Sequence, residues 1–270
     1  MRNLYAADLK RILKDKLFMV TCILAGVFAV INPLLNKVLF EALDLGEMLD
    51  GMISMNAKSM LFTAFMPGDN LGLIMPILVA IIICKDFSQG TVRNKIISGQ
   101  SRSTIFLSHL LSTTTVMCAL MLLHAFLTLG VSLLFFPYQE AAFTFKDFGY
   151  LMASLAFEML VYFAIAAIVT FIATVSKNIG ICILLYLAVA LGFSIVGAVF
   201  QVAGAFLDPA SKGYGIIEFL NALNIYTSTL IGAGTTYTAK QVLYILIAPL
   251  ALTVGSTLLG MRLFARKNLK

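Results

Sequence analysis

Long apolar segments alternate along the chain with shorter polar ones, and this pattern predicts an all-α membrane protein. A hydrocarbon core about 30 Å thick needs about 20 mainly apolar residues per helix. Six segments are predicted to span the membrane, at about residues 17–36, 69–84, 104–136, 149–175, 179–205 and 241–264. The chain is therefore expected to form a single transmembrane domain over residues 1–270.

The second span is the least regular of the six. Its apolar core from Leu71 to Cys84 has only 14 residues, and Pro67-Gly68 interrupts the apolar stretch that begins near Met60. One helix could start early and break at Pro67-Gly68. Alternatively, residues 52–66 could form a separate surface helix, and the interruption favours this second arrangement.

Proline and polar residues indicate where the other spans end. The first is expected to end near Asn32-Pro33 and the third near Phe136-Pro137, and Ser176-Lys177-Asn178 predicts a tight turn between the fourth and fifth. Residues 37–58 are expected to form an outer loop. That loop carries four acidic residues, Glu41, Asp44, Glu47 and Asp50.

The segment before the last span, residues 206–240, is too polar to cross the membrane twice. The apolar run from Ile216 to Ile231 is interrupted by Asn221, Asn224 and several serines and threonines. A re-entrant-like pair of helices, packed against protein in the outer leaflet, would satisfy its backbone groups. A structured external loop is the alternative.

Residues 2–16 have the pattern of an amphipathic helix. Its apolar positions are Leu4, Leu9, Ile12 and Leu13, and its cations are Lys10, Arg11 and Lys14. Such a helix can lie in the headgroup layer, with its apolar side in the acyl boundary and its cations near anionic lipid. The sequence thus predicts an interfacial helix before the first span.

Lysine and arginine are unevenly distributed between the two predicted sides of the membrane. One side holds fourteen of the nineteen, namely Arg2, Lys10, Arg11, Lys14, Lys16, Lys85, Arg93, Lys95, Arg102, Lys177, Arg262, Arg266, Lys267 and Lys270. The other side holds Lys37, Lys58, Lys146, Lys212 and Lys240. Because cytoplasmic loops are enriched in these cations, both termini of this multi-pass chain are expected on the cytoplasmic side of the plasma membrane. The net charge of +6 is attributed to this topology, and no nucleic-acid partner is expected.

Residue types that carry out catalysis are scarce. The four cysteines occur singly and the chain has two histidines, so neither a metal site nor a disulfide framework is expected. No Ser-His-Asp or paired-carboxylate pattern is present, and the chain lacks the G-x-x-x-x-G-K-[ST] phosphate-binding loop. The sequence thus predicts no catalytic residue, no metal and no cofactor bound by this chain.

Residues 85–109 are a polar, basic segment between the second and third apolar spans. Ser88 is suited to cap a short helix over residues 89–98, with Val92 and Ile96 on one face and Arg93 and Lys95 pointing elsewhere. Gly99 suits the end of that helix, and Ser101 or Ser103 can cap the next one. The pattern predicts a short helix lying across the inner surface of the membrane.

This segment resembles the cytoplasmic segment of the type-2 ABC exporter permeases. In that family an acidic residue precedes G-T-[IV]-[RK], and G-x-S-R follows before the third span. The corresponding residues here are Asp86, Gly90, Thr91, Val92, Arg93, Gly99, Ser101 and Arg102. The length, six spans, amphipathic first helix and irregular outer segment also resemble small bacterial permeases that export peptides or drugs. Asp86 and His109 are departures, because the family usually has glutamate at the first position and commonly lysine at the second.

The resemblance implies that the 88–98 helix is a coupling helix seated in a groove of a separate ABC ATPase, with Ile96 on its contact face. The turn at Lys177 would be a second contact. ATP and Mg²⁺ would be bound by that cytoplasmic partner, and a second permease chain, alike or different, would complete the transport path. The implied function is export of an amphipathic peptide, drug or lipid-like substrate.

Four polar residues within the predicted spans are candidates for the path. Asn32 and Gln201 lie in the first and fifth spans, and His124 and Glu158 lie in the third and fourth. Ionisable groups at membrane depth are expensive and are candidates for function. His124 and Glu158 are expected at similar depths, where a polar pair would lower the cost of burying either one.

Two other classes of function fit part of the pattern. One is an ATP-independent secondary transporter or channel, for which broken helices and internal repeats are typical. The chain has a break near its second span, but its two halves are not similar in sequence. The other is a membrane scaffold that binds an ATPase and transports nothing. Co-purification with an ATPase and the dependence of transport on it discriminate among these alternatives.

Overall fold

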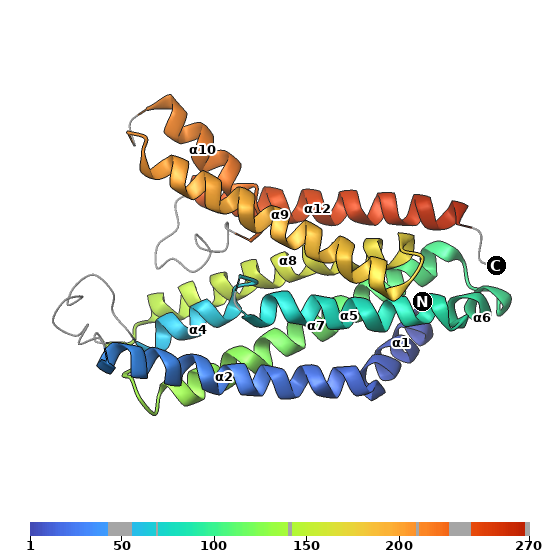
Figure 1. Cartoon of the computed structure of the whole chain (residues 1–270), viewed down its shortest axis with the longest axis horizontal. Coiled ribbons are helices and arrows are strands. Elements are labelled where there is room, and N and C mark those ends of the chain that lie inside the picture. Colours follow the sequence, from blue (N-terminus) through green and yellow to red (C-terminus); the bar gives the residue numbers. More distant parts are fainter. Residues whose placement is uncertain (43–55, 69, 140–141, 209–210, 227–238, 268–270) are drawn as a thin grey trace.

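The computed structural model describes residues 1–42, 56–68, 70–139, 142–208, 211–226 and 239–267, and it contains no strand within those ranges. The long helices form an elongated bundle (Figure 1). The first helix, α1 (Arg2–Lys14), and the C-terminal end of the last, α12 (Ala239–Arg266), lie at the same end of it. We call this the basic end, and the opposite one the distal end.

Five helices are long and apolar enough to cross a membrane. They are α2 (Lys16–Ala42), α7 (Arg102–Ser132), α8 (Phe145–Val175), α9 (Ile179–Ala205) and α12. A sixth candidate arises within the described residues if α5 (Asn70–Ser88) and the short α6 (Thr91–Ile97) count as one bent segment. The prediction of a helical membrane protein is thereby confirmed at the level of five to six candidate spans.

The first span does not end near Asn32-Pro33. Helix α2 continues through Pro33 to Ala42, so the start of the expected 37–58 loop is helical. Proline removes one backbone donor and is tolerated within membrane helices when neighbouring groups adjust. Residues 43–55, which carry Asp44, Glu47 and Asp50, lie outside the described residues.

A separate helix does precede the second span, but it is not a surface helix. Helix α4 (Ala57–Phe65) has most of its side chains buried and packs against α7 and α8. Figure 1 shows α4 and α5 following one another along the bundle, with the break at Pro67-Gly68 between them. The apolar residues of α4 are explained by burial in this position and not by contact with the membrane surface.

The third span also ends earlier than expected. Helix α7 ends at Ser132, and turns lead from there to Phe136. Helix α8 begins at Phe145 with a capping box, in which Thr144 and Asp147 each bond the other's backbone N–H. Helices α8 and α9 are joined by the predicted tight turn at residues 176–178, and Asn178 caps α9 by accepting from the Ile181 N–H (2.9 Å).

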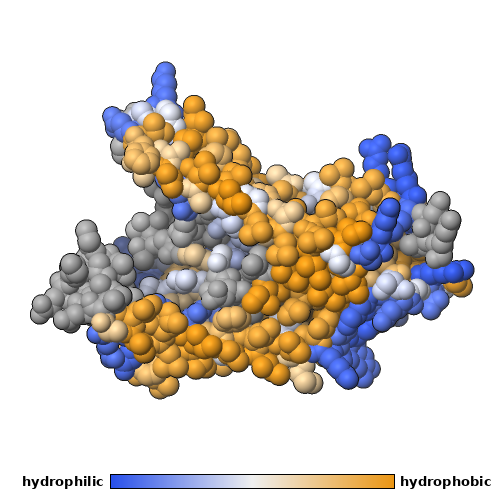
Figure 2. Space-filling view, in the orientation of Figure 1, coloured by the Kyte–Doolittle hydropathy of each residue, from blue (hydrophilic) through white to orange (hydrophobic). Residues whose placement is uncertain are grey.

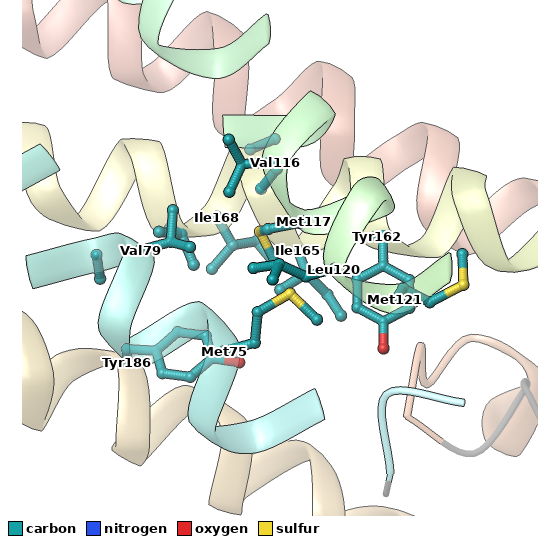
Figure 3. Packing of buried hydrophobic residues seen from close by; sticks show 14 of the residues in the cluster. Met75, Val79, Val116, Met117, Leu120, Met121, Tyr162, Ile165, Ile168 and Tyr186 are labelled. Atoms are coloured by element: carbon teal, nitrogen blue, oxygen red, sulfur yellow. The ribbon is translucent and has the colours of Figure 1, made fainter. Parts of the chain in front are cut away.

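The interior of the bundle is built around α8. Figure 3 shows Met75 of α5 and Tyr186 of α9 beside Ile165 and Ile168 of α8, with Val116, Met117 and Leu120 of α7 nearby. Helix α5 contacts both α2 and α9. Helix α5 therefore connects α2 to α9 through its packing contacts with both helices.

One helix is described in the segment expected to hold a re-entrant pair. Helix α10 (Lys212–Ala222) packs against α9 and α12. Asn224 then donates to the Phe193 carbonyl of α9, and the hydroxyls of Tyr226 and Tyr186 lie 2.8 Å apart. The rest of the segment expected to hold the pair, residues 227–238, lies outside the described residues.

The surface is apolar along the middle of the bundle, and hydrophilic residues gather at the basic end (Figure 2). Several exposed apolar side chains are on α2 and α9, among them Ile23, Val27 and Leu35 of α2 and Leu184, Ile195 and Val199 of α9. Because a soluble protein rarely exposes so large a continuous apolar surface, lipid or another apolar chain is required to cover it.

Candidate functional site

Helix α6 lies at the basic end, where a glycine flanks each of its ends. Gly90 precedes the helix with φ of 72°, and Gly99 follows it with φ of 87°. A left-handed backbone strains most other residues, so these two positions favour glycine. The chain bends by 55° between α5 and α6, which turns α6 away from the direction of α5.

The predicted cap at Ser88 is wrong. Ser88 is the last residue of α5, and its hydroxyl donates to the Lys85 carbonyl (3.0 Å). Helix α6 therefore begins later than expected, at Thr91, and has no side-chain cap. The sequence pattern placed the start of this helix at Ser88, but the left-handed backbone of Gly90 separates α5 from α6.

The other two expected signals are confirmed. The Gly99 N–H donates to the Ile96 carbonyl (2.9 Å), which ends α6. Ser101 caps α7 and accepts from the Thr104 N–H (3.2 Å).

The apolar face of α6 is packed on the protein itself. Val92 is buried in a cluster with Ile105 and Phe106 of α7 and Phe264 of α12, and Ile96 packs against that cluster. These two side chains were expected to face a partner. Because this burial leaves Val92 inaccessible and Ile96 only partly exposed, a partner would have to contact another face of α6.

Lys95 points inward, toward α1 and α7. Its ammonium lies 2.5 Å from Asp8 Oδ1 and 3.0 Å from His109 Nε2. The other carboxylate oxygen of Asp8 accepts from the Ser108 hydroxyl (2.6 Å). Since an ammonium can only donate, His109 Nε2 is the acceptor in this contact.

Asp86 lies beside this group and is fully buried. One carboxylate oxygen accepts from Arg11 of α1, and the other lies 3.8 Å from the Lys95 ammonium and 3.3 Å from His109 Nε2. We call the cluster of Asp8, Arg11, Asp86, Lys95 and His109 the polar node. It joins α1, the end of α5, α6 and α7.

The polar node has the residue types of a metal site but is filled by a cation of its own. Ligand atoms of Asp8, Asp86 and His109 all lie within 4.8 Å of one another. The Lys95 ammonium is within 3.8 Å of all three groups, and Arg11 neutralises the second carboxylate. A metal ion would have to displace a paired ammonium, so the arrangement fits an internal ion-pair network.

The polar node also explains the N-terminal helix. Most of the side of α1 expected to face acyl chains packs against α7, with Ile12 buried in the protein core, whereas Leu13 is exposed. Asp8 lies on the same face, four residues before Ile12. This acidic residue among the cations of α1 was the signal that the sequence interpretation missed, because an acid at an inward helical position needs a buried partner.

A second ion pair holds the corner between α1 and α2. Lys85 of α5 lies 3.1 Å from Asp15 Oδ2, and the Leu17 N–H donates to Asp15 Oδ1 (2.9 Å). Partial burial raises the pKa of the Asp15 carboxyl, but the bonds from Leu17 and Lys85 outweigh it and lower that pKa below its usual value. The corner is therefore tied to α5 while Asp15 is charged.

Arg102 binds the C-terminal end of α12. Its Nη1 donates to the carbonyls of Phe264 (2.8 Å) and Lys267 (2.6 Å). Lys267 donates in turn to the carbonyls of Thr174 and Ser176 at the end of α8. These cations satisfy carbonyls that helix ends leave without partners. Arg102 thus has an intramolecular role, whereas Lys177 in the adjacent turn is exposed.

The face of α6 that remains accessible carries Arg93, Asn94, Ile97 and Ser98. We call these four residues the α6 surface. Ile97 is 74% exposed, which is unusual for an isoleucine next to a buried cluster. Ile97 follows Arg93 by four residues, so an apolar and a cationic side chain share one helical face. The sequence interpretation chose Ile96, the neighbouring residue, for this position.

The four candidate path residues are not brought together. Gln201 is exposed on α9. Asn32 of α2 lines a cavity of about 220 Å³ with Thr63 and Thr128. The Nδ1–H of His124 donates to the Ala25 carbonyl of α2 (3.0 Å). No ion pair between His124 and Glu158 occurs among the described residues, so the expected polar pair is not formed.

Glu158 is buried in α8, and its Oε2 has no hydrogen-bond partner among the described residues. A buried polar group without a partner costs about 1–3 kcal/mol. We therefore expect Glu158→Met, which keeps the length of the side chain, to raise the free energy of unfolding by about that amount. Thermal unfolding in detergent micelles measures it.

Glu158→Gln is the matched control, because it keeps a polar group and removes only the ionisable one. Stability that falls in Glu158→Met would contradict the expectation. If transport is lost in both variants while stability is kept or raised, Glu158 is retained for function.

No protein-family model and no curated protein matches this chain. The fold defines the class of the protein, which is an all-helical chain with several helices of membrane-spanning length. The polar node and the α6 surface are its most specific features, and they lie at the same end of the bundle.

Proposed function

We propose that this chain is the transmembrane permease subunit of an ATP-binding-cassette exporter. The observation that carries the proposal is α6, a short helix fastened across the basic end that exposes Arg93 and Ile97. A separate cytoplasmic ABC ATPase would bind the α6 surface. ATP and Mg²⁺ would be bound by that partner, because this chain lacks a phosphate-binding loop.

The anchoring of α6 is what such a mechanism requires. Val92 fixes α6 to α7 and α12, and Lys95 fixes it to α1 through Asp8. Force applied to Ile97 would therefore move several helices together and would not bend a loop. Rigid-body movement of packed helices about an interface is an established way to convert a local event into a large transition.

The same contacts suggest how movement would reach the transport path. Asp86 lies near the end of α5 and belongs to the polar node. Helix α5 in turn contacts both α2 and α9. The exposed apolar faces of α2 and α9 would then meet lipid or a second permease chain, alike or different. Asn32 and Gln201 lie on these two helices and would contact the substrate, an amphipathic peptide, drug or lipid-like molecule.

The orientation in the membrane follows from the cations. The basic end would lie in the cytoplasm, so that both termini and α6 face the ATPase. Lys177, exposed in the turn between α8 and α9, would supply a second, smaller contact. The distal end, with α10, would lie on the outer side of the plasma membrane.

The proposal predicts that changing the α6 surface detaches the ATPase. Arg93→Glu with Ile97→Asp would place two acids where a cation and an apolar side chain are exposed. Loss of a central interface contact costs about 2 kcal/mol or more, which corresponds to binding about 30-fold weaker. Co-purification of the ATPase with the tagged chain, scored by ATP hydrolysis and mass spectrometry, measures the effect.

The matched control is Leu13→Asp with Lys14→Glu on α1. Both residues are exposed at the same end of the bundle, and the control makes the same changes in charge and polarity. Undiminished association in the α6 variant would contradict the proposal. Transport that continues with no ATPase present would favour a secondary transporter or channel, and ATPase binding without any transport would favour a scaffold.

A further inference from the structure

The distal half of the bundle contains an apolar cavity of about 470 Å³ between α4, α7 and α8. Its inner wall is formed by Leu61 and Phe65 of α4, which are buried. Phe126 of α7 and Met152 of α8 line its outer part and are exposed. The cavity thus reaches from the protein core to the outer surface of two candidate spans.

The chemistry of the walls restricts what can fill this cavity. The residues that line it are aliphatic and aromatic. Water is retained in a cavity only where two to four polar partners are available, so ordered water does not explain a cavity of this kind. Its size lies within the range of about 300–1,000 Å³ for small-molecule sites. The occupant is therefore expected to be hydrocarbon.

The rim above the cavity is polar and closely tied together. The Lys58 ammonium of α4 lies 2.8 Å from Asp147 Oδ1 and 3.0 Å from Gln139 Oε1. The backbone N–H groups of Ala57 and Lys58 donate to the carbonyls of Pro137 and Tyr138. These contacts join the beginnings of α4 and α8 above the opening and hold the cavity in one shape.

Along α8, charged side chains at the rim are followed by apolar side chains in the cavity, as the headgroup of a phospholipid is followed by its acyl chains. Asp147 lies at the rim with the exposed Lys146 beside it, while Leu151 and Leu155 line the cavity one and two turns below. With about 1.5 Å of rise per residue, Leu155 lies about 12 Å below Asp147. A phosphate at the rim would be close to Lys146, and an acyl chain attached to it would extend into the cavity.

We propose that this cavity holds one acyl chain of a phospholipid from the leaflet around the distal end. The site is distinct from the surfaces assigned above to the ATPase and the second chain. Neither α2 nor α9 contributes to its wall. The lipid would fill the space between α4 and α8 and so support the broken segment that contains α4.

The absence of tryptophan from the chain allows a direct test. Phe126→Trp, an aromatic replacement at a side chain that is 59% exposed, places a fluorescent reporter on the cavity wall. Leu243→Trp on α12 is the control, because Leu243 is 56% exposed and does not line the cavity. Each full-length variant is reconstituted in dioleoyl phosphatidylcholine vesicles with increasing fractions of a phosphatidylglycerol brominated at mid-chain.

We expect quenching of Phe126→Trp to saturate at a several-fold lower fraction of brominated lipid than quenching of Leu243→Trp, because Lys146 at the rim would favour the anionic phosphatidylglycerol over the zwitterionic phosphatidylcholine in the site. Adding Leu155→Phe narrows the cavity and should return the curve to that of the control. Coincident curves for the two reporters would overturn the proposal. Met152→Trp provides a second reporter on the same wall should Phe126→Trp fail to fold.

Discussion

Asp86→Ala is expected to lower the free energy of unfolding by about 3–5 kcal/mol, the largest effect of any single change considered. The carboxylate is fully buried, accepts from Arg11 and faces the Lys95 ammonium at 3.8 Å. Its removal would leave two cations crowded in the polar node with only Asp8 to neutralise them. Unfolding of the purified chain in detergent micelles, followed by circular dichroism, measures the loss.

The exposed pair of Lys37 and Glu41 is the matched control for Asp86. The two residues are also held by an ion pair (3.7 Å), but on the surface of α2. Exposed pairs spaced i,i+4 contribute about 0.3–0.5 kcal/mol, so Glu41→Gln should change stability little. Equal losses in Asp86→Ala and Glu41→Gln would mean that the polar node does not hold α1 to the bundle.

The polar node also leads to a prediction about transport that can be tested separately from its effect on stability. Asp8→Asn weakens the bond from Lys95 to α1 but leaves Val92 in its cluster. If rigid attachment of α6 to α1 transmits force, Asp8→Asn should retain the ATPase on purification and reduce transport.

Gly260→Ala is expected to destabilise the chain by about 1–3 kcal/mol, the cost of overpacking a close contact. A Cβ atom at this position of α12 would lie 2.5 Å from two ring carbons of Phe106. Phe106 is buried in the cluster beneath α6 together with Val92, so its ring cannot move without disturbing that cluster. The loss of stability should be accompanied by weaker association with the ATPase.

Gly255→Ala, five residues earlier on the same helix, is the control. A Cβ atom there meets nothing within 4 Å, and alanine favours helix over glycine by about 1 kcal/mol. Gly255→Ala should therefore be neutral or stabilising. A double-mutant cycle with Phe106→Leu tests the mechanism, because removing the ring should relieve part of the cost of Gly260→Ala. Strict additivity would show that the ring is not the obstacle.

The positions of the long helices could be predicted well from the sequence because each is specified locally. The fifth span, Ile179–Ala205, begins and ends at the predicted residues. Errors occurred where proline was read as a helix end, as at Pro33. In a membrane helix, neighbouring groups compensate for the lost donor, so proline marks a boundary less reliably there than in water.

The candidate site was predicted less well, because its details depend on which side of each helix meets another helix. The segment, its glycines and the Ser101 cap were found from their order along the chain. The sequence pattern favoured Ile96, because it could not show that α7 and α12 cover one face of α6 and leave Ile97 as the more exposed of the two. Glu158 was expected to pair with His124, yet His124 bonds the Ala25 carbonyl of another helix.

The sequence by itself determined the helical membrane class and the segment from which α6 forms, since apolar length, glycine positions and charge are local properties. Only the tertiary structure decided that Lys95 turns inward to Asp8, that Ile97 is left exposed, and that an apolar cavity opens between α4, α7 and α8. These features arise where helices distant in the sequence pack together. Which polar groups are buried, and therefore need partners, depends on this packing and cannot be read from the order of residues along the chain.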